Sequence, residues 1–560
     1  MKSMPDLDQL TPEQLRTLAG ELFTQVQARD EAIAQRDQAI VQRDVAITQK
    51  EAVIEDKDRL INQHESSLVA KDQIIAERDR AIALYKIRED KLSHEMALLR
   101  RYQFGKRSEG LDSQQMSMLE DLVEADIAAI ETEMAKISVK PKSERPKQQA
   151  KRQALPKEFA RTEIHHEPDS STCSCGCQRE RIGEDVHEKL DYQPGTFTVE
   201  RHIRGKWVCR ECETLTQAPV PPHIIDKGIP TTGLLAQVLV SKYADHQPLY
   251  RQEQIYARAG MHLPRSTLAD WIGRCGVELR PLIEALREEL LTHSVLHADE
   301  TPVAMLAPGK KKTHRAYVWA YTSTQFAPVQ GVVYEFWPGR SGEAVRTFLD
   351  DWKGKLICDD FKGYKACFKN GITEIGCMAH ARRKFYDLHV ANQSPVAEQA
   401  LNTFRLLYEI EREAAELYIQ QRYQLRQEQA KPILDKLHEW LLLKRQQVNN
   451  GTATAKAIDY SLKRWVALIR YLDDGEVPID NNWCENQIRP WALGRSNWLF
   501  AGSLRSGQRA ANIMSLIQSA KINGLDPHAY LKDVMERLPT QKANQIQELL
   551  PHNWSSDRKV

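Results

Sequence analysis

The chain has 560 residues, and its 78 Lys and Arg side chains nearly balance its 77 Asp and Glu side chains. This length exceeds what one ordinary core holds, so we expect several domains, and the charge balance confines any basic surface to part of the molecule. The sequence has no run of about 18 apolar residues, which excludes a membrane-spanning helix, and its start, MKSMPDLDQL, has no apolar segment. We therefore expect a cytoplasmic protein.

A seven-residue repeat begins the chain. The segments RDEAIAQ, RDQAIVQ and RDVAITQ follow one another, and one position of the repeat is Ile or Leu throughout. A sustained seven-residue period is typical of a coiled coil, but the position three residues later is basic or His, as at Arg36 and His64. The pattern predicts a helical oligomerisation region over residues 1–135, with a solvated single stalk as an equal alternative. Residues 136–160, with repeated Pro and mostly basic charge, are expected to form a linker.

A cysteine cluster follows the linker. Cys209 and Cys212 have the two-residue gap of a zinc knuckle, whereas one-residue gaps separate the cysteines of the segment STCSCGC. We predict a DNA-binding module over residues 161–222 that holds a structural Zn²⁺ through Cys173, Cys175, Cys209 and Cys212, with Cys177 as a rival ligand. The alternative is a small β module with free thiols. The single cysteines elsewhere are expected to be buried small apolar residues.

Residues 223–290 have helical patterns. The segment YRQEQIYARAGMHLPRSTLADWI predicts a helix, a short turn at Gly260 and a second helix. The second helix of such a unit enters the major groove of DNA, so Arg265, Ser266 and Thr267 at its start are candidates for DNA contact. An ordinary helical hairpin is an equal alternative.

Strand and helix patterns alternate from residue 291. Their order, three strands, helix, strand, helix, strand and helix, predicts a ribonuclease H-like α/β fold with a mixed sheet covered by helices. The first strand is expected to end at Asp299 and Glu300, and the fourth at Asp359 and Asp360. Because the first and fourth strands are neighbours in that fold, Asp299 and Asp359 are expected to lie side by side.

Adjacent carboxylates repel one another unless a cation lies between them. Mg²⁺ takes oxygen ligands, and two such ions about 3.5–4 Å apart stabilise the attacking and leaving oxygens of a phosphoryl displacement. Glu485, in DNNWCENQIRP, is the candidate for the third carboxylate. We therefore predict a site for Mg²⁺ or Mn²⁺, with two ions. The alternative is that these acids are ordinary loop-end residues and caps.

The segments HADETPV, CDDFKGY, CMAHARRKF and DNNWCENQIRPWALGRSNWLFAGS resemble the DDE transposases of the insertion sequence 66 family of bacterial mobile elements. The resemblance extends to LLRRYQFGKRSE before the linker, to the cysteine module and to SAKINGLDPHAYLKDV near the C-terminus. It implies that Asp299, Asp359 and Glu485 are the catalytic, metal-binding acids. It also implies two small companion proteins encoded by the same element.

The resemblance further implies the remaining organisation. A catalytic core of residues 291–503 would contain a helical insertion at about residues 387–470, and residues 504–560 would form a helical C-terminal domain. Trp491 and Trp498 are candidates either for stacking on bases or for the core. Basic residues near the acids are candidates for contact with DNA phosphates: His380, Arg382, Arg383, Lys384, Arg489 and Arg495.

The predicted function is that of a homo-oligomeric DNA transposase, which binds the ends of its element, cuts them and joins them to target DNA. Two other functions stay open. One is a sequence-specific DNA-binding regulator or inactive transposase remnant without catalysis. The other is a structure-specific nuclease of the same fold, which cuts DNA but does not join it.

Overall fold

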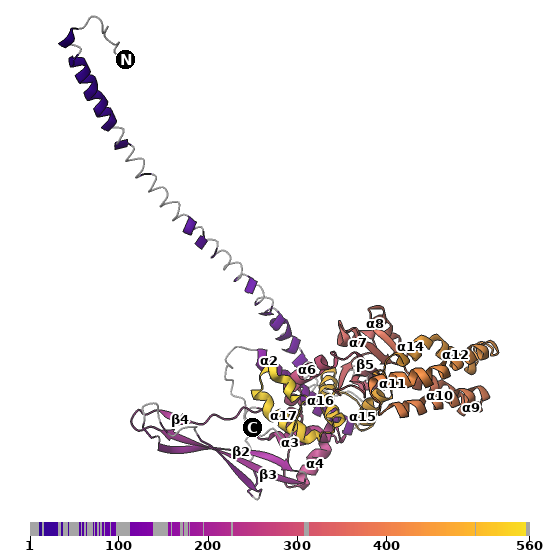
Figure 1. The fold of residues 1–560 in the computed structure, drawn as a ribbon. Coiled ribbons are helices and arrows are strands. Elements are labelled where there is room, and N and C mark those ends of the chain that lie inside the picture. Colours follow the sequence, from indigo (N-terminus) through magenta and orange to yellow (C-terminus); the bar gives the residue numbers. More distant parts are fainter. Residues whose placement is uncertain are drawn as a thin grey trace. The chain divides into compact units, whose positions relative to one another are not determined.

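The computed structural model describes residues 113–137, 155–157, 159–167, 172, 177–178, 180–193, 195–225, 228–306, 313–498 and 500–555, with short stretches between residues 11 and 96 (Figure 1). The chain divides into two units, residues 1–91 and residues 92–560. In the first unit, residues 16–31 are helical, and the apolar side chains of Phe23, Leu60 and Ile82 are exposed. Much of the seven-residue repeat lies outside the described residues, so its role in oligomerisation stays a prediction.

The second unit includes a small sheet that corresponds to the predicted cysteine module. Its strands are β1 (Arg161–His166), β2 (Glu180–Gln193), β3 (Thr196–Val208) and β4 (Leu215–Gln217). The β2–β3 hairpin turns at Gly195, whose φ of 87° suits glycine, and β1 and β4 both pair with β3. The turn between β3 and β4 contains Cys209 and Cys212.

Four helices follow the small sheet: α3 (Thr232–Tyr243), α4 (Leu249–Arg258), α5 (Arg265–Glu278) and α6 (Arg280–Leu290). Helices α4 and α5 lie where the sequence predicted them, with Gly260 in the connecting turn at a φ of 88°. Helix α5 is largely buried, because Gly273 approaches Ala125 of helix α2 (Ser113–Ile137) and Gly276 approaches Arg509. The first turn of α5 is open to a partner, and Asp270 and Arg274 further along the helix are also partly exposed.

A mixed five-stranded sheet forms the centre of the unit. It contains β5 (Val295–Met305), β6 (His314–Ser323), β7 (Val332–Trp337), β8 (Lys355–Cys358) and β9 (Thr373–Gly376), in the order β7-β6-β5-β8-β9. Helix α7 (Gly342–Leu349) connects β7 to β8, and α8 (Lys365–Lys369) lies between β8 and β9. The predicted order of elements and the pairing of the first and fourth strands are confirmed.

The first strand is longer than predicted. The sequence indicated that it ends at Asp299 and Glu300, but β5 continues to Met305 because those residues stay paired with β6, as in Asp299 with Ala320. Its parallel partner β8 pairs with it only as far as His297. Asp299 therefore lies within β5, just past the point where β8 stops.

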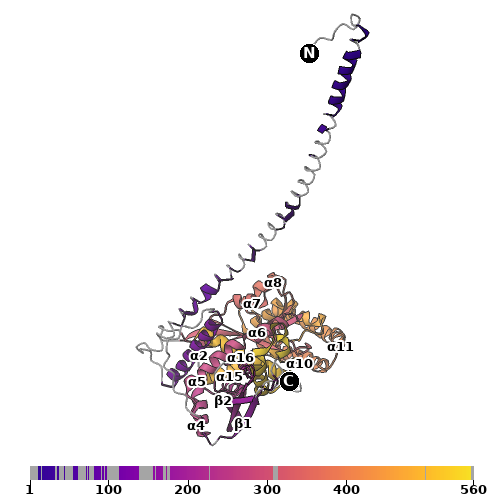
Figure 2. The same cartoon turned by 90° about the vertical axis from the view of Figure 1, so that its left-hand side faces the viewer.

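A group of helices separates the end of the sheet from the last catalytic candidate. It comprises α9 (Met378–Asn392), α10 (Pro395–Ala414), α11 (Ile419–Leu425), α12 (Lys431–Gln446), α13 (Ala453–Lys463) and α14 (Trp465–Ile469). Helices α10 and α11 lie next to one another (Figure 2). These helices share a core that includes Phe385, Phe404, Leu434 and Leu441.

The chain then returns to the sheet. Helix α15 (Asn482–Trp498) packs on β5 and β6, α16 (Leu504–Ile522) packs on β7, and α17 (Pro527–Arg537) packs on α3. Among the described residues, no helix is both long enough and apolar enough to cross a membrane.

Candidate active site

The three acids singled out in the sequence come from three separate elements. Asp299 lies in β5, Asp359 directly follows β8, and Glu485 lies in the first turn of α15. Because β5 and β8 run parallel and pair up to His297 and Ile357, Asp299 and Asp359 leave the paired region at the same end. Asp299 and Glu485 line a common cleft of about 640 Å³. The structure therefore brings the three acids together.

The electrostatics of Asp299 reflect this proximity. Burial raises the pKa of the Asp299 carboxyl well above its usual range, and the negative charges of Glu300, Glu485 and Asp359 raise it further. The backbone N–H of Glu300 donates to Asp299 at 2.9 Å, and that of Phe361 donates to Asp359 at 2.8 Å. These two bonds fix the orientation of both carboxylates.

The turn before α15 positions Glu485. The buried side chain of Asn481 donates to the carbonyl oxygen of Ala298 at 3.1 Å, and its Oδ1 lies 2.8 Å from Nδ1 of His297. Because the Asn481 amide nitrogen is the donor to Ala298, its oxygen is the acceptor, and His297 Nδ1 carries the proton. The N–H of Glu485 donates to the Asn481 carbonyl at 3.0 Å. Asn481 thus ties the start of α15 to β5, next to Asp299.

Helix α9 presents two of its predicted DNA-contacting residues to Glu485 instead. His380 Nδ1 lies 3.8 Å from Glu485 Oε1, and the Arg383 guanidinium lies 3.9 Å from Oε2. Burial lowers the pKa of His380, which favours the neutral ring. Arg382 lies over the ring of Tyr386, and Lys384 lies over that of Tyr460.

The neighbouring acids have other partners. Glu300 is bound by Arg340 and accepts a 2.6 Å hydrogen bond from the Tyr364 hydroxyl. Asp360 forms ion pairs with Lys365 at 3.0 Å and Arg464 at 3.3 Å. Nothing in the sequence signals Arg340 or Tyr364, because each lies far along the chain from Glu300. Arg340 also lies 3.9 Å from Asp359, a looser contact than its bond to Glu300. Asp299, Asp359 and Glu485 are therefore the acids best placed for a cation.

The residues of the cleft fit a divalent cation. The three carboxylates are the hard oxygen donors that such ions take, and their mutual repulsion, seen in the raised pKa of Asp299, is relieved by positive charge between them. The solvent-inaccessible Oε1 atom of Glu485 has no hydrogen-bond partner among the described residues. An orphaned carboxylate oxygen of this kind is available to a cation.

A second, basic concavity adjoins the cleft. It has a volume of about 680 Å³, lies between α9 and α10, and shares Arg383 and Asn482 with the acid-lined cleft. Its other polar lining residues are Arg382, Tyr386, Asn402, Arg405, Tyr408 and Arg412. Arg405 and Arg412 were not predicted from the sequence. Their seven-residue spacing along α10, which places them on one face, is the signal that was available.

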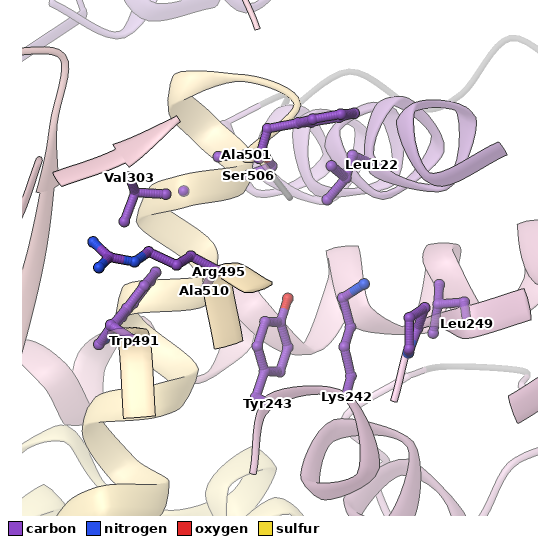
Figure 3. A pocket seen from close by; sticks show the side chains of 13 residues that line it. Leu122, Lys242, Tyr243, Leu249, Val303, Trp491, Arg495, Ala501, Ser506 and Ala510 are labelled. Atoms are coloured by element: carbon purple, nitrogen blue, oxygen red, sulfur yellow. The ribbon is translucent and has the colours of Figure 1, made fainter. Parts of the chain in front are cut away.

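The remaining candidates of α15 divide into exposed and structural residues. Arg489 is exposed and lines the cleft, as a DNA contact requires. Arg495 donates to the carbonyl of Pro302 at 3.1 Å and so also fastens α15 to β5. Trp491 is buried against Tyr334, which confirms its core alternative, and the side chain of Trp498 lies outside the described residues. Figure 3 shows Trp491 and Arg495 lining a mostly apolar cavity together with Val303.

The candidates outside the cleft occupy the predicted elements. Arg265 forms an ion pair with Glu253 at 3.4 Å. In the first turn of α5, Ser266 is exposed and Thr267 is half-buried. Cys209 is buried, Cys212 is exposed and Cys177 is half-buried, while Cys173 and Cys175 lie outside the described residues. The zinc ligands therefore stay a prediction.

Comparison with family models matches nearly the whole chain beyond the N-terminal repeat. The model described as transposase IS66 family matches residues 227–509, and that of the IS66 C-terminal element matches residues 515–552. The zinc-finger binding domain of transposase IS66 matches residues 170–213. The model described as transposase C of IS166 homeodomain matches residues 91–164.

Curated relatives in Sinorhizobium fredii align over most of their length. The protein named uncharacterized protein y4qI is 36% identical over 485 residues, which cover 83% of this chain and 89% of the relative. Uncharacterized protein y4jD is 36% identical over 490 residues, which cover 83% of this chain and 95% of the relative.

Proposed function

Because this chain belongs to the transposase IS66 family, we propose that it binds the ends of its insertion sequence and catalyses metal-dependent DNA cleavage and strand transfer into target DNA. The observation that carries the proposal is that Asp299 and Glu485 line one cleft, with Asp359 close enough for its charge to raise the pKa of Asp299. Three acids brought together from a sheet and a distant helix suit two divalent cations, Mg²⁺ or Mn²⁺.

We propose a ribonuclease H-like core for this site. Three antiparallel strands, β7, β6 and β5, are followed in the sheet by the parallel strands β8 and β9. The strand order supports this assignment, as does the presence of acids on β5 and after β8. The helical insertion lies between the second and the third acid in the chain.

The residues of the cleft have separable roles in the proposed mechanism. Asp299, Asp359 and Glu485 hold the cations, which supply Lewis-acid stabilisation of the attacking and leaving oxygens. Asn481 and His297 hold Glu485 against β5, so the acids are positioned before DNA binds. Cleavage and joining use the same in-line attack, by water and by a 3′-hydroxyl respectively.

The basic concavity provides a path for DNA beside the acids. Arg383 borders both the acid-lined cleft and this concavity. Arg405 and Arg412 continue along α10, where Glu409 pairs with both and leaves a net positive charge for the three side chains. Arg489 adds charge within the cleft. Phosphate contacts of this kind set the register of DNA without reading its sequence.

The flanking parts serve recognition and assembly in this proposal. The module of residues 161–222, with structural Zn²⁺, and the first turn of α5 in the region of residues 223–290 contact the element ends. The N-terminal helical region associates protomers. The two small companion proteins of the element are further proposed partners.

An assay with purified protein, labelled element-end DNA and Mg²⁺ tests the function. We expect cleavage and strand-transfer products that disappear in Asp299→Ala, Asp359→Ala and Glu485→Ala. The matched control is Asp360→Asn, an acid next to the site that is paired with Lys365 and Arg464. Binding without cleavage would favour a regulator or an inactive remnant, and cleavage without joining would favour a nuclease.

A further inference from the structure

Two side-chain atoms beside the acids are both inaccessible to solvent and unpaired. Nδ1 of His380 and Oε1 of Glu485 have no hydrogen-bond partner among the described residues, although they face each other at 3.8 Å. This distance is too long for a hydrogen bond between them. A buried polar atom without a partner costs about 1–3 kcal/mol, so two such atoms at close range indicate a partner that both would share.

The separation of the two atoms suits a shared cation after a small side-chain movement. Two ligands bound to one ion at about 2.1 Å each are about 3.0 Å apart at an octahedral angle and about 3.4 Å apart at a tetrahedral angle. The observed 3.8 Å is slightly longer than either value. A water that hydrogen-bonds both atoms would hold them roughly 4.5 Å apart, so a measurement that detects coordinated nitrogen has to distinguish the two.

We propose that His380 Nδ1 is a ligand of the divalent cation held by Glu485, and that this mixed nitrogen and oxygen site binds first-row transition-metal dications more tightly than Mg²⁺. This inference rests on the proposed metal site and specifies one further ligand and the class of cation. Imidazole nitrogen is a borderline donor that transition metals accept readily, whereas Mg²⁺ prefers oxygen and retains its water. Affinity should therefore increase from Mn²⁺ to Co²⁺.

The other groups around the pair are consistent with this assignment. Arg383 contacts Oε2 of Glu485, so the second carboxylate oxygen, Oε1, is the one directed at His380. Cys377 Sγ lies within 4.8 Å of both ligand atoms. It already accepts a hydrogen bond from the backbone N–H of Asn481 at 3.2 Å.

Pulsed electron paramagnetic resonance of bound Mn²⁺ tests the proposal directly, because it detects the nuclear spin of a coordinated nitrogen. The full chain is first given one equivalent of zinc, which the thiolate ligands of the cysteine module take up in preference to a mixed nitrogen and oxygen site, and free zinc is then removed. We expect a nitrogen coupling in the wild type that is absent in His380→Ala and His380→Asn. The Asn variant retains an oxygen donor and guards against loss of folding.

Affinity provides the second measurement. We expect His380→Ala to weaken Mn²⁺ binding about tenfold or more and to leave Mg²⁺ binding nearly unchanged. His389→Ala, a histidine variant further along the same helix, is the matched control and should keep both the coupling and the affinity.

Two results would overturn the inference in different ways. Mn²⁺ that binds in an Asp299-dependent manner but shows no nitrogen coupling would leave the proposed function intact and remove His380 from the ligand set. Failure of the wild type to bind Mn²⁺ at all, in a folded protein, would contradict the metal site on which the proposed function depends.

Discussion

His297 and Asn481 are both fully buried, and they join the central strand β5 to the start of helix α15 through a 2.8 Å hydrogen bond. The same Asn481 side chain donates to the carbonyl of Ala298, the residue before Asp299. One asparagine therefore contributes two of the hydrogen bonds that hold the third catalytic candidate near the first. Asn481 therefore positions Glu485, whereas Glu485 itself is the proposed metal ligand.

Asn481→Ala should slow DNA cleavage while leaving DNA affinity nearly unchanged. The substitution removes both links to β5, so Glu485 loses its fixed position, and a displacement of about 1 Å lowers a rate roughly 100-fold. Single-turnover cleavage and equilibrium binding to element-end DNA measure the two effects. Asn497→Ala is the control, because that exposed residue bonds only weakly to its own helix. Equal losses of rate and affinity would contradict a positioning role.

His297 makes stability depend on pH. Burial lowers the pKa of its ring to about 4, whereas an unfolded histidine titrates at about 6.5. The unfolded chain therefore binds more protons between these values, and the contribution of His297 to stability is present above pH 6.5 and lost as the pH falls towards 4. We expect His297→Gln to be less stable than the wild type at pH 7.5, and the difference to narrow at pH 5. A melting-temperature difference that is constant over this range would be inconsistent with the buried, neutral ring.

Sequence patterns were sufficient for the order of elements in the central sheet, because that order depends on local periodicity. They also indicated three acids that lie near one another in the structure, although the catalytic role of these acids stays a prediction. Sequence patterns were insufficient for contacts between distant segments. Arg340 and Tyr364 lie 40 and 64 residues from Glu300, and no local pattern relates them. On α9, the three-residue spacing of His380 and Arg383 indicates that they share a face. The sequence does not indicate that this face lies against Glu485, because that contact depends on how α15 packs.

The arginines of α10 should contribute to DNA affinity and its salt dependence. Arg405→Ala and Arg412→Ala each remove one positive charge from the basic concavity. We expect each variant to bind all DNA sequences more weakly, and by a similar factor. The slope of log affinity against log salt concentration should fall in magnitude by about 1 for each lost contact between an arginine and a phosphate. Lys436→Ala, on the exposed side of α12, is the control. An unchanged salt slope in both arginine variants would exclude DNA from this surface.

Asp299→Asn should stabilise the protein in the absence of added divalent cations. Burial and the nearby acids raise the pKa of Asp299, so the folded state binds this proton more tightly than the unfolded state. Ionisation of the carboxyl as the pH rises therefore lowers the free energy of unfolding. Removing the charge should raise the melting temperature by about 1 °C for each 1 kcal/mol of penalty removed, because the entropy of unfolding is large for a unit of this size. Added Mn²⁺ should then stabilise the wild type more than the variant. A variant that melts lower than the wild type would show that Asp299 is not under electrostatic strain.

The cysteine module should contain one zinc ion per chain, which native mass spectrometry can count. Cys209→Ser and Cys212→Ser, in the turn after β3, should abolish zinc binding because a tetrahedral thiolate site needs all four ligands. Comparison of Cys175→Ser with Cys177→Ser shows which of these two cysteines binds zinc. We expect Cys175→Ser to lose zinc and Cys177→Ser to retain it. Cys275→Ala, at a buried cysteine of α5, serves as the control. Zinc retained in both Cys209→Ser and Cys212→Ser would contradict the site.

The last prediction concerns helix α2, which belongs to the region expected to mediate oligomerisation but packs against α5 and α16. Asp126 of α2 and Arg509 of α16 form an ion pair at 2.8 Å with side chains only 1% and 4% exposed. Removing one member of a buried pair leaves an uncompensated charge, so Asp126→Ala should lower the free energy of unfolding by about 3–5 kcal/mol.

Replacing both members tests the physical cause. Asp126→Leu combined with Arg509→Met substitutes apolar side chains for both charges, and such exchanges are often neutral or stabilising. We expect urea unfolding to show that the double variant recovers most of the stability lost in Asp126→Ala. If the double variant were as unstable as Asp126→Ala, the loss would have to arise from packing, because no unpaired charge would remain. Recovery would instead establish that the loss in Asp126→Ala arises from the unpaired, buried charge of Arg509.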